Sequence, residues 1–200
     1  MPNIGTTVWA FKYKDGVMVA ADTQVTGGWL KLKDFHRILP VGEESVIACS
    51  GEMSDLQNLK KMLDVKYEED VIENDGALFM HPRQYHNYIG QYQYKKRMKG
   101  DPVQVNAIVA GIDKSKNEVF LGCSDVFGMK LEKDYFITGL GMHYCGVIFA
   151  KNWKPDMTEA EARQLVETCG KVMFTYDKKA LDKIQFTTIT HANGVQIGEP

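Results

Sequence analysis

The sequence predicts an α+β fold in which antiparallel sheets pack against each other and helices cover their outer faces. Strand-like runs occur at the start, in the middle and at the end of the chain, and two pairs of helical segments separate them. The run at residues 17–21 is apolar on both faces, so its sheet needs cover on both sides. The 200 residues contain no linker, repeat or low-complexity tract, and residues 1–200 are therefore expected to form a single domain.

The first quarter of the chain is predicted to be a small sheet. Residues 7–13 alternate with the period of a strand, and Asp15-Gly16 then forms a hairpin turn into the apolar run. A second strand pair is expected at residues 37–41 and 45–49, with a glycine-containing turn between the two strands.

The next segment changes to helical spacing. Ser54 and Gln57 match a capping box, and apolar residues follow at spacings of three and four, which predicts a helix of about four turns. Pro82 stands where a first helical residue is favoured, so a second helix is expected to begin there. Two strands, at residues 103–112 and 118–124, should follow.

The last third of the chain repeats the alternation of strand and helix. Thr158 and Glu161 form a capping box that opens an amphipathic helix. The other elements are expected to be a strand at 135–137, a helix at 139–153, and strands at 184–190 and 195–197 joined through Asn193-Gly194.

The composition argues against several classes of function. A net charge of −2 gives no electrostatic reason to expect nucleic acid or a membrane surface as a partner. No long apolar run and no signal segment occur, so we expect a soluble protein of the cytoplasm and nucleus. The four cysteines lie far apart and the five histidines put no two ligands on one helical face, so no metal is expected. No cofactor is expected either, because Gly139-Leu140-Gly141 lacks the third glycine of a dinucleotide loop.

Several motifs resemble those of one family over nearly the whole chain. GTTVWAF at 5–11, DGVMVAAD at 15–22 and ACSG at 48–51 resemble the opening segments of proteasome β subunits. The resemblance implies the four-layer αββα sandwich of the N-terminal-nucleophile hydrolases. The motifs most like the non-catalytic class called type 4, or beta-7, are PR at 82–83, FLGCSD at 120–125, EAEAR at 159–163 and IQFTTIT at 184–190.

In this family, the resemblance implies that a Gly-Thr bond is cut autocatalytically and that the freed threonine hydroxyl attacks a peptide carbonyl. Thr6 occupies that position, and its own amine, with a pKa of about 7.7–8.0 once free, would act as base. While Gly5 is attached, however, the Thr6 nitrogen is an amide that cannot accept a proton. Asp22 and Asp177 match the two acidic positions of the family's site.

The family's lysine is missing. Its position falls on Ile38, or on Arg37 if the preceding loop is one residue shorter, and we favour Arg37 because the shorter loop keeps the following strand in register. Arginine stays charged, so it can neutralise the two aspartates but cannot exchange a proton as lysine does. Lys31 and Lys33 are close in sequence and are expected to lie in the loop.

Two hydroxyl groups are missing as well. The serine of the family's Gly-Ser-Gly turn is replaced by Leu140, and a serine after the later aspartate is replaced by Ala180. Because proton-relay groups act as a unit, losing three of them should abolish their function. We therefore expect no catalytic residue, and a degenerate nucleophile site made of Thr6, Asp22, Arg37, Leu140, Asp177 and Ala180.

The leading hypothesis is a structural β-ring subunit of the proteasome core. The resemblance implies three kinds of partner: neighbouring β subunits, α-ring subunits and β subunits of the opposite ring. Two alternatives remain open, namely an active threonine endopeptidase that uses Thr6, and a different N-terminal-nucleophile hydrolase that acts on small amides. The type-4 class usually carries a C-terminal arm, whereas this sequence stops at residues 198–200, so a tether to the opposite ring is expected to be weak or absent.

Overall fold

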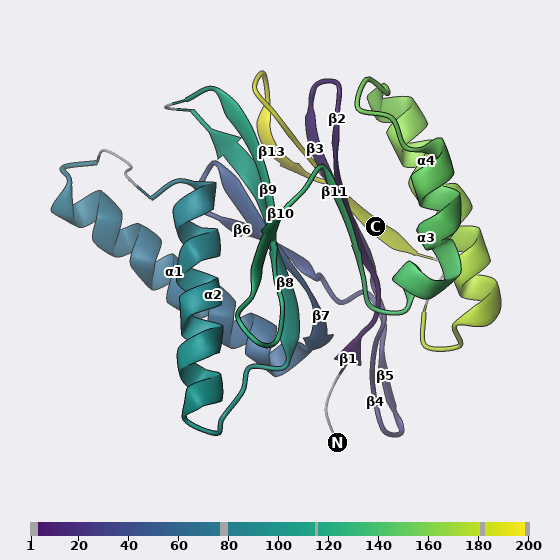
Figure 1. Ribbon diagram of the computed structural model, residues 1–200, viewed down its shortest axis with the longest axis horizontal. Helices are drawn as coiled ribbons and strands as arrows, with labels where there is room; N and C mark the ends of the chain where they lie inside the picture. The colour runs from purple at the N-terminus through teal and green to yellow at the C-terminus, as the bar shows by residue number, and fades with distance from the viewer. Residues whose placement is uncertain (1–3, 77–79, 115, 181–182, 199–200) are drawn as a thin grey trace.

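The structure, a computed structural model, describes residues 4–76, 80–114, 116–180 and 183–198. The elements form four layers, with a helix pair on each outer side and two antiparallel sheets face to face between them (Figure 1). This arrangement confirms the predicted α+β fold class and its αββα order.

The larger sheet has eight strands. Its spatial order is β10-β9-β8-β7-β1-β4-β5, and β6 pairs with the first half of β7. The strands are β1 (Ile4–Gly5), β4 (Val25–Gly27), β5 (Leu30–Leu32), β6 (Ile38–Val41), β7 (Ser45–Glu52), β8 (Val105–Asp113), β9 (Glu118–Ser124) and β10 (Lys130–Glu132).

The smaller sheet has five strands in the order β11-β2-β3-β12-β13. Its central strand, β3, is buried along its whole length, as its apolar sequence predicts. The strands are β2 (Val8–Tyr13), β3 (Gly16–Asp22), β11 (Tyr135–Thr138), β12 (Ile184–Thr190) and β13 (Gly194–Ile197).

The helices are long and come in pairs. Helices α1 (Met53–Glu73) and α2 (Pro82–Met98) cover the larger sheet, and α3 (Gly141–Asn152) and α4 (Glu159–Tyr176) cover the smaller one (Figure 1). Thr158 caps α4 with both hydrogen bonds of the predicted capping box. Within the described residues, no helix has the length and apolar character needed to cross a bilayer.

Three apolar clusters hold the four layers together. The middle cluster lies between the sheets and contains small and β-branched side chains such as Val19 and Ile108. The outer clusters lie between each sheet and its helices and contain larger side chains such as Leu59 on one side and Phe149 on the other. Successive strand residues point to opposite faces, so the same strands supply both an inner and an outer cluster.

Two parts of the fold differ from the sequence-based expectation. Helix α1 has 21 residues and is capped by Glu52, whose side chain accepts the Ser54 N–H, so the predicted Ser54 cap and four-turn length were wrong. Strands β1, β4, β5 and β10 were not expected, and Lys31 lies in β5 rather than in a loop. These strands have two or three residues, which is too short for a period of two to be visible.

Candidate functional site

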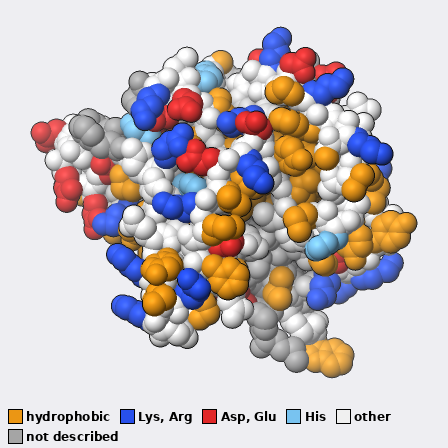
Figure 2. Space-filling model, viewed as in Figure 1, with side chains coloured by type: hydrophobic (Ala, Val, Ile, Leu, Met, Phe, Trp, Pro, Cys, Tyr) orange, Lys and Arg blue, Asp and Glu red, His pale blue; other side chains and the backbone are white. Residues whose placement is uncertain are grey.

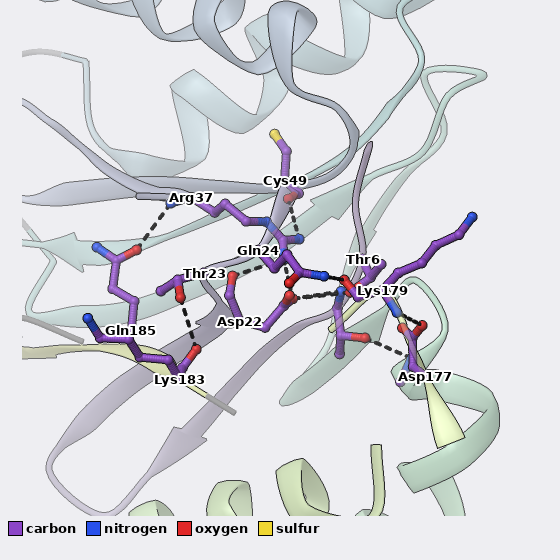
Figure 3. Close-up of polar contacts among 12 residues, drawn as sticks. Thr6, Asp22, Thr23, Gln24, Arg37, Cys49, Asp177, Lys179, Lys183 and Gln185 are labelled. Atoms are coloured by element: carbon purple, nitrogen blue, oxygen red, sulfur yellow. Dashed lines mark hydrogen bonds and ion pairs between the residues drawn. The ribbon is translucent and has the colours of Figure 1, made fainter. Parts of the chain in front are cut away.

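The centre of the site is an ion pair between Asp22, which ends β3 of the smaller sheet, and Arg37, which directly precedes β6 of the larger sheet (Figure 3). One guanidinium nitrogen, Nη1, contacts Asp22 Oδ1 and also donates to the Asp22 carbonyl oxygen at 3.2 Å. The other, Nη2, donates to the carbonyl oxygen of Cys49 at 3.0 Å. Both charged side chains are 0% exposed. In the structure Arg37, and not Ile38, is the residue that contacts the aspartate.

Gln185 holds the backbone of Arg37 in place. Its Oε1 accepts the N–H groups of Arg37 at 3.1 Å and of Ile38 at 3.3 Å, and its Nε2 donates to the Ile38 carbonyl at 3.4 Å. Gln185 belongs to β12 of the smaller sheet, whereas Ile38 begins β6 of the larger one. The sequence analysis missed this residue, although a glutamine on the inward face of a strand is a visible signal.

Thr6 follows directly after a strand of the larger sheet. Its Oγ1 donates to Asp22 Oδ1 at 3.2 Å, and the Thr7 N–H donates to the same oxygen at 3.3 Å. The preceding residues, Ile4 and Gly5, form β1, which pairs with β4 on one side and with β7 on the other. The Gly5-Thr6 peptide bond therefore directly follows a strand whose last residue, Gly5, is paired on both sides.

Gly5 also packs closely against the ion pair. A Cβ atom on this residue would lie 2.5 Å from Arg37 Nε and 2.9 Å from Met53 Cε, which is closer than real Cβ contacts. Glycine at position 5 is therefore required by the presence of the guanidinium, independently of any cleavage.

The Gly139-Leu140-Gly141 turn packs on the backbone next to Thr6. The Gly141 N–H donates to Thr7 Oγ1 at 2.9 Å, and a Cβ on Gly139 would lie 1.9 Å from the Thr6 carbonyl oxygen. Gly139 has a φ of +67°, which favours glycine. Leu140 is at the N-cap position of α3, makes no side-chain capping bond and is half-exposed. It brings no hydroxyl to the site.

Asp177 and Ala180 lie at the end of α4. The Asp177 side chain is buried, and its Oδ1 accepts the N–H of Lys179 at 2.9 Å. The Ala180 N–H donates to the Asp177 carbonyl at 3.2 Å. Within the described residues Asp177 has no ion-pair partner, so the expectation that Arg37 would neutralise both aspartates holds for Asp22 alone. Gln24, two residues after Asp22, links the segment that follows β3 to the segment that follows α4, because its side-chain N–H donates to the Lys179 carbonyl oxygen at 2.7 Å.

Burial dominates the electrostatics of this site. It raises the pKa of the Asp22 carboxyl, while the Arg37 guanidinium, the Thr7 N–H and the Thr6 hydroxyl oppose the rise. Burial likewise raises the pKa of the Cys49 thiol, which keeps it protonated and unreactive. Lys31 and Lys33 are exposed, and neither forms a salt bridge or hydrogen bond with Thr6 in the described part of the chain.

The potential metal ligands and the cysteines of the described ranges are placed as follows. No group of three or more potential ligands is placed to hold a metal ion there. The four cysteines are all free and buried.

The comparisons with known proteins agree with this architecture. A family model described as "Proteasome subunit" matches residues 3–189. The chain belongs to the proteasome subunit family. "Proteasome subunit beta type-4" of Arabidopsis thaliana is 32% identical over 98% of this chain and 78% of the relative. "Probable proteasome subunit beta type-7" of Encephalitozoon cuniculi is 32% identical over 98% and 89%. "Proteasome subunit beta 2" of Thermococcus gammatolerans is 28% identical over 93% and 90%.

Membership of the proteasome family gives the site its context. The four-layer sandwich is that of the N-terminal-nucleophile hydrolases, and Thr6 lies beside Asp22 in the region where the family resemblance implies a nucleophile. Buried Arg37, rather than a lysine, contacts Asp22 there. Its guanidinium cannot exchange protons near neutral pH.

Proposed function

We propose that this chain is a non-catalytic, structural β-ring subunit of a 20S proteasome core. Its role would be to complete the wall of the chamber in which ubiquitin-tagged and unfolded proteins are degraded while other subunits cut. The observation that carries the proposal is the buried Arg37–Asp22 ion pair in the place of a working nucleophile site.

Nucleophilic catalysis by threonine needs a group that takes the hydroxyl proton. The Thr6 hydroxyl donates a hydrogen bond to the Asp22 carboxylate, whose charge is already compensated by Arg37. Arg37 cannot accept a proton, and the Thr6 nitrogen is a peptide amide next to β1. Leu140 and Ala180 add no hydroxyl that could relay the proton. Among the described residues at the site, Asp22 is the group that accepts the Thr6 hydrogen bond, and its ion pair with Arg37 weakens it as a base. The site can therefore support structure but is poorly equipped to activate Thr6.

The partners follow from the same proposal. The chain would contact neighbouring β subunits in its ring, α-ring subunits on one side and β subunits of the opposite ring on the other. We propose the cytoplasm and nucleus as its location, with no nucleic acid, membrane or cofactor involved. The relatives named beta type-4 and beta type-7 support a β-ring position.

The alternative function is a threonine endopeptidase that uses Thr6 after cleavage of the Gly5-Thr6 bond. Cleavage would give Thr6 a free amine, but it would also have to withdraw Gly5 from its pairing with β4 and β7. Proteolysis would then have to proceed with arginine in place of lysine, and this makes the alternative the weaker proposal.

The test is the intact mass of the chain taken from native particles. A tagged chain is purified from its own cells, sized, and treated with a covalent threonine-directed inhibitor. We expect it in a large particle with other proteasome subunits, with Gly5 still attached and without label, whereas active subunits of the same particle take up label and serve as the positive control. A mass beginning at Thr6, or a labelled chain, would establish the endopeptidase instead. A discrete small oligomer would favour a hydrolase of small amides.

A Thr6→Ala variant gives an independent readout. Because the Thr6 hydroxyl makes one hydrogen bond, to a carboxylate that is already paired with Arg37, its removal should leave assembly and the peptidase activity of the particle unchanged. Loss of a peptidase activity with normal assembly would contradict the proposal.

A further inference from the structure

A group of large apolar side chains lies exposed where the end of α2 meets the turn between β9 and β10. Figure 2 shows hydrophobic side chains on this face with lysine and arginine side chains among them. Each of the apolar side chains is between 50% and 67% exposed. We call this surface the α2 patch, formed by Tyr94, Met98 and Phe127.

The turn that carries Phe127 is held rigidly. Asp125 Oδ1 accepts the N–H groups of Phe127 at 2.9 Å and of Met129 at 2.8 Å. Gly128, with a φ of +83°, packs directly on the helix, since a Cβ there would lie 2.6 Å from the Gly90 carbonyl oxygen. The backbone of the turn is thus fixed, so a partner that binds it would lose little backbone entropy in ordering it.

Arg97 connects the two halves of the patch. Its guanidinium carbon lies 5.4 Å from the centroid of the Tyr94 ring and 5.6 Å from that of Phe127. The cation therefore stacks between an aromatic ring of the helix and one of the turn. Such stacking leaves the edge of the guanidinium free to bind a carboxylate.

The charged side chains of the last turn of α2 are all positive. The sequence of α2 contains no acidic residue, and its last turn carries Lys95, Lys96 and Arg97. Lys96 pairs with Asp101, while Lys95 and Lys99 are exposed and have no ion-pair partner among the described residues. The helix dipole accounts for cations at a helix C-terminus, but it does not account for the three exposed apolar side chains among them.

We propose that the α2 patch is a docking surface for an acidic segment with an apolar face, contributed by a neighbouring subunit of the same particle. This inference rests on the proposed function, because it requires such a neighbour. The partner's apolar side chains would cover Met98 and Phe127, and its carboxylates would bind Arg97 and Lys99. A patch of this kind acts as the energetic centre of a larger interface, where aromatic residues and arginine carry most of the binding.

The test combines site-specific photo-cross-linking with charge reversal. A photoreactive amino acid at Met98 of the tagged chain should form an adduct with a segment of another proteasome subunit that is rich in Asp or Glu. Arg97→Glu/Lys99→Glu should lower the fraction of chain found in particles at least about tenfold, because like charges would then face each other across the interface. Lys14→Glu/Lys116→Glu is the matched control, since both lysines are exposed at turns away from the patch.

A rescue experiment separates docking from general damage. Once the adduct identifies the acidic segment, changing its carboxylates to lysine should restore incorporation of Arg97→Glu/Lys99→Glu. The variant should also keep the wild-type melting temperature, because these side chains are exposed.

Several outcomes would overturn the docking proposal. These are normal incorporation of the charge-reversed chain, an adduct to a segment without acidic residues, an adduct to a second copy of this chain, or binding only to anionic vesicles. If the wild-type chain is absent from any large particle, the proposed function fails as well. If it is present in the particle but Met98 forms no adduct, only the docking surface is wrong.

Discussion

Replacing Arg37 by methionine should lower the free energy of unfolding by about 3–5 kcal/mol, the usual cost of removing one partner of a buried ion pair. Both charged side chains are 0% exposed, so the Asp22 carboxylate would remain in the interior without a counter-charge. The carbonyl oxygens of Asp22 and Cys49 would also lose the guanidinium that donates to them. Methionine is unbranched and can fill much of the same space, so packing loss should be the smaller part.

The cost should depend on pH. Burial raises the pKa of the Asp22 carboxyl and Arg37 opposes this, so the pKa rises further when Arg37 is removed. A carboxyl whose pKa is higher in the folded than in the unfolded chain binds a proton on folding. The buried Asp22 carboxyl therefore destabilises the fold increasingly as the pH rises above about 3.9, the pKa of an aspartate in the unfolded chain. The difference between variant and wild type should be smallest near pH 4 and largest at neutral pH.

Urea unfolding of the purified chain, followed by circular dichroism, measures the effect. Arg163→Met is the matched control, because the Arg163–Glu159 pair is 41% and 45% exposed and should contribute only about 0–1 kcal/mol. Asp22→Asn/Arg37→Met should regain part of the loss, since no charge then stays buried. A loss at neutral pH as small as that of the control would refute the reasoning.

Three further predictions concern residues around the site and the helix layer. Gly5→Ala should destabilise by about 1–3 kcal/mol in thermal melts because its Cβ would overlap the Arg37 guanidinium, whereas Gly146→Ala, with no atom within 4 Å of the new Cβ, should be neutral or stabilising. Gln185→Leu should cost about 2–4 kcal/mol in urea unfolding, since two buried N–H groups lose their acceptor; a loss below that of the surface control would contradict the role assigned to it. Burial lowers the pKa of His86, so its stability contribution should be present above the unfolded pKa of about 6.5 and be lost as the pH falls below it; His86→Gln should flatten this dependence, and an unchanged slope would count against it.

Local patterns in the sequence were sufficient for most of the secondary structure. The apolar run at 17–21, the capping box at Thr158 and the turn before Gly194 each act over a few residues, and each is found in the fold. Helix α1 shows the limit of such patterns, because its cap came from Glu52, which competes with Ser54 for the same end of the helix. The first residue of a helix therefore depends on which of several neighbouring side chains caps its N-terminus.

For the site, too, some features could be predicted from the sequence and others depended on the tertiary structure. The replacement of the lysine by arginine and the absence of two hydroxyls could be recognised from the residues themselves. Their consequences depended on contacts between distant segments: Arg37 meets Asp22, while Asp177 instead closes the end of α4. Gln185 lies 148 positions from Arg37, and no local pattern can show that its side chain reaches that backbone.

The sequence by itself determined the types of most elements, the family features and the residue types missing from the nucleophile site, because these depend on periodicity and on side-chain chemistry. Only the tertiary structure decided that β1 inserts between β4 and β7 and that Gly5 makes room for a buried guanidinium. A two-residue strand has no periodicity of its own, and its pairing is set by partners far away in the chain.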